Sequence, residues 1–260
     1  MNNSKLLLVT GAGDGLGREV SIEMSKSGYD IVCISKSSNV HDTARAIDAS
    51  KAKCFTVQED ISNYIEIESN LSKIPFGNYD SVSCVYCAAV LGDNKGILDN
   101  DLSTWTNTFN VNVISNLRIC KIICQNIIDK KIISKHVFLA GGGSAYAYPD
   151  FFSYSLSKTA VVRAVENLAA ELSDHKRITF YSIAPGAMKT KMLEKVEESD
   201  AYVKTYVPIS ETVGFISNLL INNYEILSGK FIHVRDYIDN YQNSNISINL
   251  NKWTLRRNEE

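Results

Sequence analysis

The chain has 260 residues, 45% of them hydrophobic and 22% charged, which suits a globular protein with a sizeable core. Its formal net charge is -2 and its longest basic run is Arg256-Arg257, so nucleic acid and anionic membranes are excluded as electrostatically favoured partners. The amino terminus passes into an apolar run too short for a signal peptide, and no later apolar run reaches membrane-spanning length. We therefore expect a cytoplasmic protein that binds small molecules.

The first predicted strand covers residues 5–10, where a continuous apolar run is typical of a parallel strand buried on both faces. A glycine-rich turn follows, and a periodic segment from Leu16 to Lys26 predicts a helix. This order favours phosphate binding, because glycine lets the backbone approach the phosphate and the helix dipole attracts negative charge. We expect a dinucleotide to contact Gly11, Asp14, Gly15, Leu16 and Gly17.

The second predicted strand, Asp30 to Ser35, indicates which dinucleotide is bound. An acidic residue about 20 positions after the glycines binds a ribose 2′-hydroxyl, whereas a basic residue accommodates a 2′-phosphate. Ser35 and Lys36 occupy this place, while Asp30 lies at the opposite end of the strand. NADP(H) is therefore favoured; NAD(H) is the alternative cofactor, and a solvated surface side chain is the alternative reading of Lys36.

Strands and helices continue to alternate along the chain, with no internal repeat and no linker. About seven strands separated by helices predict an α/β fold, a single Rossmann-like domain over residues 1–260 built on a doubly wound parallel sheet. The remaining predicted elements are, in order, a helix at 41–50, a strand at 53–57, a helix at 61–73, a strand at 81–87, a helix at 102–131, a strand at 136–140, a helix at 151–173, a strand at 177–183, a helix at 211–221 and a strand at 230–234.

Two of these strands end in further candidate cofactor contacts. Asp60 and Ile61 follow the third strand, at the edge where ligands bind in parallel sheets, and helix capping is the alternative role of Asp60. Ala88 and Ala89 follow the fourth strand, where small side chains would let a cofactor lie against the backbone.

Tyr154 and Lys158 are the candidate catalytic residues. Four positions apart on a predicted helix, they project from the same face, so the ammonium could stabilise a tyrosinate. A phenol has a pKa of about 10, and a nearby cation lowers it, which would let Tyr154 exchange a proton with a carbonyl or an alcohol near neutral pH. The spacing alone also occurs in ordinary helices.

The six cysteines are expected to be reduced thiols rather than metal ligands. Cys84 and Cys87 lie three apart on a predicted strand and so face opposite sides. Cys120 and Cys124 share a face of the long helix and are expected in the core, so no metal site is predicted. The same helix contains Asn112, an unfavourable residue in a helix interior.

Two segments lack a clear pattern. Residues 187–210 are polar, charged and weakly periodic, and we expect them to form a substrate flap over the site. The tail from about residue 237 is asparagine-rich, and the sequence assigns it no structure.

Together these residues resemble the compact, single-domain branch of the short-chain dehydrogenase/reductase family over residues 4–235. The glycine turn, Asp60-Ile61, the alanines after the fourth strand, Tyr154 and Lys158 occur in the family's order. The resemblance adds three roles: Asn112 would hold a water that connects Lys158 with solvent, Lys158 would bond the nicotinamide ribose, and a segment embracing the nicotinamide would contain Pro185, Gly186 and Thr190.

One position departs from the family. The serine expected 13 residues before the tyrosine is Gly141 here, and Ser144 is the nearest hydroxyl. Backbone N–H groups of residues 141–143 could polarise the substrate carbonyl instead.

The resemblance implies an NADP(H)-dependent oxidoreductase that interconverts a carbonyl and a secondary alcohol on a small polar substrate, with a sugar derivative as one candidate. A dinucleotide-binding sensor or assembly subunit without turnover is the alternative, favoured by Gly141, and a cofactor-recycling epimerase or dehydratase is a third. A homodimer or homotetramer is expected, supported by apolar residues around the two long helices, among them Phe151 and Phe152.

Overall fold

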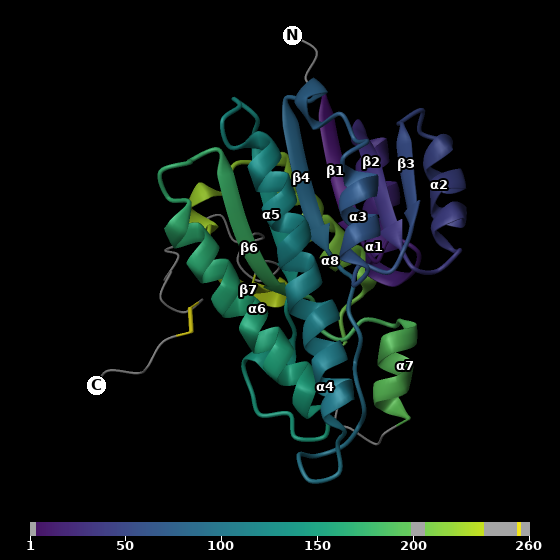
Figure 1. Ribbon diagram of the computed structural model, residues 1–260, viewed down its shortest axis with the longest axis vertical. Helices are drawn as coiled ribbons and strands as arrows, with labels where there is room; N and C mark the ends of the chain where they lie inside the picture. The colour runs from purple at the N-terminus through teal and green to yellow at the C-terminus, as the bar shows by residue number, and fades with distance from the viewer. Residues whose placement is uncertain (1–3, 199–205, 237–253, 256–260) are drawn as a thin grey trace.

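The computed structural model describes residues 4–198, 206–236 and 254–255. Its centre is one parallel sheet in the order β3-β2-β1-β4-β5-β6-β7 (Figure 1). The order reverses between β1 and β4, which confirms the predicted doubly wound fold. The strands are β1 (Lys5–Thr10), β2 (Tyr29–Ser35), β3 (Cys54–Gln58), β4 (Ser81–Tyr86), β5 (Ser134–Leu139), β6 (Ile178–Ala184) and β7 (Phe231–His233).

Helices cover both faces of the sheet, and two more extend beyond the carboxyl ends of its strands (Figure 1). One face is covered by α1 (Gly15–Lys26), α2 (Val40–Asp48) and α8 (Ile209–Ile221). The other is covered by α3 (Tyr64–Leu71), α5 (Asn116–Ile127) and α6 (Phe152–Glu171). The two helices at the carboxyl edge are α4 (Leu102–Phe109) and α7 (Lys191–Glu197).

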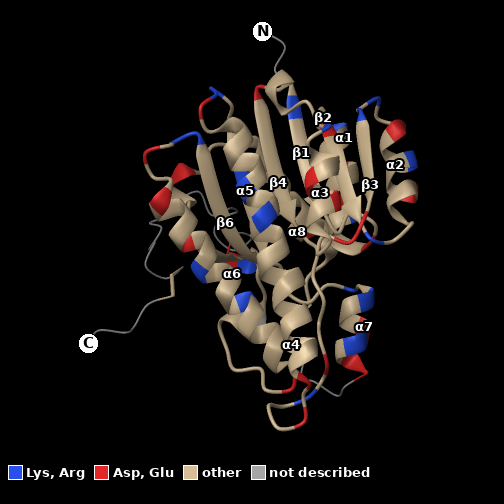
Figure 2. Ribbon diagram, in the orientation of Figure 1, with Lys and Arg blue, Asp and Glu red and all other residues tan. Residues whose placement is uncertain are grey.

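The first strand explains why the core has two halves. Leu6 and Leu8 pack into the apolar cluster under α5, whereas Leu7 and Val9 pack into the cluster under α1. Successive side chains of a strand point to opposite faces, so a continuous apolar run fills both layers. Charged residues lie mainly on the helices and loops, while most of the length of the strands is uncharged (Figure 2).

The helix predicted over residues 102–131 is divided. It consists of α4, a π-helical segment over Asn110–Ser115, and α5, which ends at Ile127. The amide of Asn112 bonds the backbone N–H and carbonyl of Val90, and that of Asn116 bonds the carbonyl of Val111. These asparagines therefore serve contacts outside the ordinary helical ladder, and π segments are common near functional sites.

Part of the predicted flap is ordered structure. Its helix α7 places Leu193 and Val196 against Phe151, which is 1% exposed and so gives no apolar outer surface to the long helix that follows it. Residues 199–205 of the flap, and residues 237–253 and 256–260 of the tail, lie outside the described residues. Among the residues that are described, no helix is long and apolar enough to cross a membrane.

Candidate active site

A cavity of about 1570 Å³ opens at the carboxyl ends of the strands. It is larger than the pockets of most small ligands, which leaves room for an extended cofactor beside a substrate. Of the residues predicted to bind cofactor or catalyse, all but Asn112 line it: Gly11, Asp14, Gly15, Leu16, Gly17, Ser35, Lys36, Asp60, Ile61, Ala88, Ala89, Tyr154, Lys158, Pro185, Gly186 and Thr190.

The glycine turn forms one wall of the cavity and brings the N-terminus of α1 to it. Gly11 has a φ of 71° and lies so close to the segment after β4 that a Cβ would be 2.8 Å from the backbone nitrogen of Ala88. A Cβ on Gly17 would collide with the Gly11 carbonyl, so both positions require glycine. The first turn of α1 contains no acidic residue, and this N-terminus suits a diphosphate group.

Asp14 leaves the helix end uncapped because its carboxylate points elsewhere. It accepts hydrogen bonds from the side chain of Asn39 at 3.0 Å and forms an ion pair with Lys191 at 3.1 Å. Asp14 thereby joins the glycine turn to the start of α2 and to the flap helix α7.

The ends of β2 and β3 form the next part of the wall. Ser35 and Lys36 line the cavity after β2, and Asp60 does so after β3. Partial burial would raise the pKa of Asp60, but hydrogen bonds from the N–H and hydroxyl of Ser62, with Lys36 nearby, hold this pKa below its usual value. Asp60 is thus an ionised acceptor that stabilises the turn before α3.

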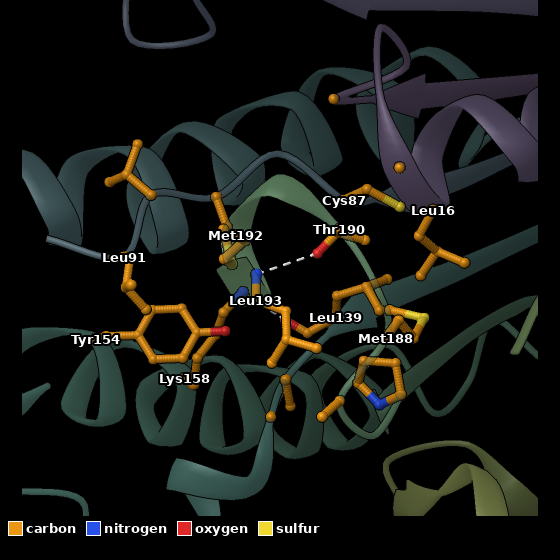
Figure 3. Close-up of a pocket in the computed structure, with 18 of the residues that line it drawn as sticks. Leu16, Cys87, Leu91, Leu139, Tyr154, Lys158, Met188, Thr190, Met192 and Leu193 are labelled. Carbon is orange, nitrogen blue, oxygen red and sulfur yellow. Dashed lines mark hydrogen bonds between the residues drawn. The ribbon is translucent and has the colours of Figure 1, made fainter. Parts of the chain in front are cut away.

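Tyr154 and Lys158 project from α6 into the middle of the cavity (Figure 3). The Lys158 ammonium donates to the Leu139 carbonyl at 2.8 Å and lies 5.6 Å from the centre of the Tyr154 ring. Burial lowers the pKa of Lys158 to about 8. Burial and the neighbouring Tyr148 raise the pKa of Tyr154 to about 12, which is the opposite direction from the lowering by Lys158 that the sequence led us to expect. At neutral pH the phenol therefore holds its proton.

Asn112 is 1% exposed and lies behind the cavity wall. Its amide group donates to the Val90 carbonyl at 2.9 Å and to the Ser157 hydroxyl at 2.9 Å, and it accepts from the Val90 N–H at 2.8 Å. Both amide hydrogens are used, so this side chain supports the loop after β4 and the helix that carries Tyr154 and Lys158.

Asn116 is a residue that the sequence analysis missed. Its amide donates to the Ala88 carbonyl at 3.1 Å and accepts from Thr10 at 3.0 Å, and Thr10 in turn accepts from the Ala88 N–H at 3.1 Å. This network holds the small-residue segment after β4 against the glycine turn. The one sequence signal for Asn116 was its place in the same predicted helix as Asn110 and Asn112.

Gly141 leaves space beside the Tyr154 phenol. A Cβ there would lie 3.6 Å from the Tyr154 hydroxyl, at ordinary van der Waals distance. Ser144 does not line the cavity, and its buried hydroxyl has no hydrogen-bond partner among the described residues. The nearest hydroxyl in sequence therefore does not take the place of the family serine.

Other lining residues gave no signal in the sequence; they come from loops, from the flap helix α7 and from the last strand. Tyr148 precedes α6 and packs against Phe151, with 5.2 Å between ring centres. His233 ends β7, and burial, followed by the charge of Arg235, lowers its pKa. Leu193 faces the cavity beside Thr190, whose hydroxyl accepts from the Leu193 N–H (Figure 3).

Comparisons with known proteins found matches over most of the chain. A family model described as short chain dehydrogenase matches residues 5–201. Dehydrogenase/reductase SDR family member 11 of Bos taurus is 28% identical over 206 residues, covering 75% of this chain and 79% of the relative. A variant of actinorhodin polyketide ketoreductase with NADPH has a TM-score of 0.81 at 20% identity, covering 90% of this chain and 97% of that one. NAD+-bound xylitol dehydrogenase has a TM-score of 0.80 at 18% identity, with 90% and 98% covered.

Proposed function

The chain belongs to the short-chain dehydrogenase/reductase family and is an NAD(P)-dependent oxidoreductase, and we propose that it interconverts a carbonyl and a secondary alcohol on a small polar substrate. The observation that carries this proposal is the position of Tyr154 and Lys158, both directed into the cavity that begins at the N-terminus of α1. Sugar derivatives are one candidate substrate class, because Tyr148, His233 and Arg235 add polar groups to the same cavity.

Tyr154 and Lys158 are the proposed catalytic residues. The nicotinamide cofactor supplies or accepts the hydride when it is bound. In carbonyl reduction the Tyr154 phenol donates its proton to the substrate oxygen, and in alcohol oxidation the tyrosinate takes that proton back. The Lys158 ammonium stabilises the tyrosinate electrostatically, and Leu139 fixes its position.

We assign the cofactor to the lining residues that follow the strands. The α1 N-terminus would hold the diphosphate, Asp60 and Ile61 the adenine end, and Pro185, Gly186 and Thr190 the nicotinamide end. Lys36 favours NADP(H) over NAD(H), since its cation would attract a 2′-phosphate.

Asn112 acts in this proposal as a positioning residue. Its hydrogen bonds to Val90 and Ser157 hold the π segment against α6, so Lys158 keeps its place beneath the phenol. Polarisation of the substrate oxygen falls to backbone N–H groups of residues 141–143, because Gly141 brings no hydroxyl.

A homodimer or homotetramer completes the proposal. Ile114 in the π segment and Leu156 on α6 are 44% and 42% exposed, and they give neighbouring helices apolar outer surfaces. Trp105 and Phe152 stack with ring centres 4.8 Å apart and link α4 to α6 beside them. Paired helices are a common two-fold interface.

The proposal is tested by following nicotinamide absorbance with a panel of ketones, ketosugars and polyols, supplied with NADPH, NADH or their oxidised forms. Turnover of at least one small polar member is the expected result. Tight cofactor binding without turnover across the panel, in both directions, would count against the proposed substrate class.

A further inference from the structure

Three metal-binding side chains meet in the core on the α5 face of the sheet. Cys120 and Cys124 are 1% and 8% exposed, and His136 is fully buried. One ligand atom from each lies within 4.8 Å of those of the other two. None of the three lines the cofactor cavity, so this cluster is separate from the proposed catalysis.

The fold brings these residues together from two elements. Cys120 and Cys124 lie one turn apart on the buried face of α5, and His136 points toward them from the interior strand β5. The Cys120 sulfur is 3.7 Å from Nδ1 of His136, and the Cys124 sulfur is 3.7 Å from Nε2. In a tetrahedral zinc site, bonds of about 2.3 Å to sulfur and about 2.0 Å to nitrogen place each sulfur about 3.5 Å from the one ligating nitrogen. Cys120 is near this spacing to Nδ1, whereas Cys124 is near it to the other ring nitrogen.

The hydrogen bonds of His136 assign its protons. The Ser134 hydroxyl donates its one hydrogen to the Val82 carbonyl, so it accepts from Nε2–H of the imidazole at 2.9 Å. Nδ1 then carries a lone pair, which accepts from the Tyr86 hydroxyl at 2.9 Å. A metal-bound histidine usually donates its second ring N–H to such a partner, so Ser134 orients Nδ1 as a ligand.

Two sulfur donors and one imidazole nitrogen, buried in an apolar core, favour a particular metal ion. We propose that Cys120, Cys124 and His136 bind one Zn²⁺. Two thiolates and a neutral imidazole cancel the charge of a divalent ion, which permits burial in an apolar core. Binding releases the two thiol protons, and the ion takes the Nδ1 lone pair in place of the hydrogen bond from Tyr86.

The test measures metal content in the full-length chain. Protein expressed with added zinc is dialysed against a chelator and analysed by atomic mass spectrometry, and the zinc ligands are identified by X-ray absorption. We expect about one zinc per chain with sulfur at about 2.3 Å and nitrogen at about 2.0 Å. A mercurial reagent that blocks thiols should release this zinc from the wild-type protein, so this second test requires no variant.

Substitutions locate the site. The double variant Cys120→Ala and Cys124→Ala should contain less than a tenth of the wild-type zinc. Cys54→Ala is the matched control, because Cys54 belongs to a different thiol pair, 3.8 Å from Cys33 and without an imidazole, and should keep its zinc. Zinc-free wild-type protein after expression in zinc, zinc retained by the double variant, or oxygen and nitrogen ligands alone would each overturn the proposal.

Discussion

Gly141 leaves the side of the Tyr154 hydroxyl open, and this position tests how the substrate oxygen is polarised. If backbone N–H groups of residues 141–143 already act as donors, Gly141→Ser should change turnover by less than about tenfold. For comparison, removal of a donor that an enzyme needs typically lowers turnover by about 10²–10³-fold. The Cβ would lie 3.6 Å from the phenol oxygen, so the substitution fits without displacing Tyr154.

Ser144→Ala is the companion variant. Its hydroxyl is buried, without a partner among the described residues, and outside the cavity lining, so its loss should leave turnover unchanged and the melting temperature equal or higher. A strong gain of turnover in Gly141→Ser, with turnover unchanged in Ser144→Ala, would exclude two groups as substitutes for the family serine: the backbone N–H groups of residues 141–143 and the Ser144 hydroxyl.

Lys36 is the proposed reader of the 2′-phosphate. Lys36→Ala should weaken NADPH binding by about tenfold or more, because a charge-assisted hydrogen bond contributes about 1.5–3 kcal/mol, and should change NADH binding little. Fluorescence titration of both cofactors measures this difference. Lys26→Ala at the end of α1 is the control, and equal losses for NADPH and NADH would exclude Lys36 as the specificity residue.

Single residues were predictable where a motif fixes their place at a strand end. The glycines, Asp60, Tyr154 and Lys158 belong to such motifs, and all line the cavity. The support role of Asn112 was not predictable, because its partners Val90 and Ser157 are 22 and 45 positions away. The pKa of Tyr154 also depends on burial, which spacing on a helix does not reveal.

At the scale of elements, Asn116 holds the loop after β4 to the glycine turn. Asn116→Ala would leave the Ala88 carbonyl and the Thr10 hydroxyl without this partner, so unfolding free energy should fall by about 1–3 kcal/mol and cofactor binding should weaken. Chemical denaturation and cofactor titration measure both effects. Asn126→Ala, on the exposed side of α5, should change neither.

Lys135 connects β5 with the end of α8. Its buried ammonium donates to the carbonyls of Leu220, at 2.9 Å, and Asn222. Burial and the charge of Lys5 lower the pKa of Lys135 from 10.5 to about 8, so between these values the unfolded chain holds the proton more tightly. This group therefore makes stability rise as pH increases from about 8 to 10.5.

Lys135→Met should remove that rise and lower stability at pH 7, because it leaves helix-end carbonyls unpaired. Denaturation of both proteins at several pH values between 7 and 10 measures the difference. An unchanged pH dependence would show that Lys135 titrates alike in the folded and unfolded chain.

Element positions followed well from the sequence, since buried strands and amphipathic helices carry different periodicities. The π segment did not, because it depends on hydrogen bonds from Asn112 and Asn116 to residues outside the predicted helix. The flap helix α7 was also missed: its buried residues Leu193 and Val196 find their partner, Phe151, in a distant loop.

At the scale of the whole molecule, parallel pairing places the chemistry of distant segments at one edge of the sheet. Residues from the glycine turn to His233 share one cavity because every strand ends on the same side. The same pairing brings His136 to Cys120 and Cys124, which is why a sequence that offered only two helical thiols predicted no metal site.

Tyr154 is the proposed proton donor, and the most direct measurement of this role compares cofactor affinity and turnover in wild type and Tyr154→Phe. The variant keeps the ring, so cofactor binding should stay near wild type while turnover falls by several orders of magnitude. Tyr64→Phe, a surface phenol with 50% exposure, should behave as wild type. Turnover retained by Tyr154→Phe within about tenfold would contradict the proposed catalysis.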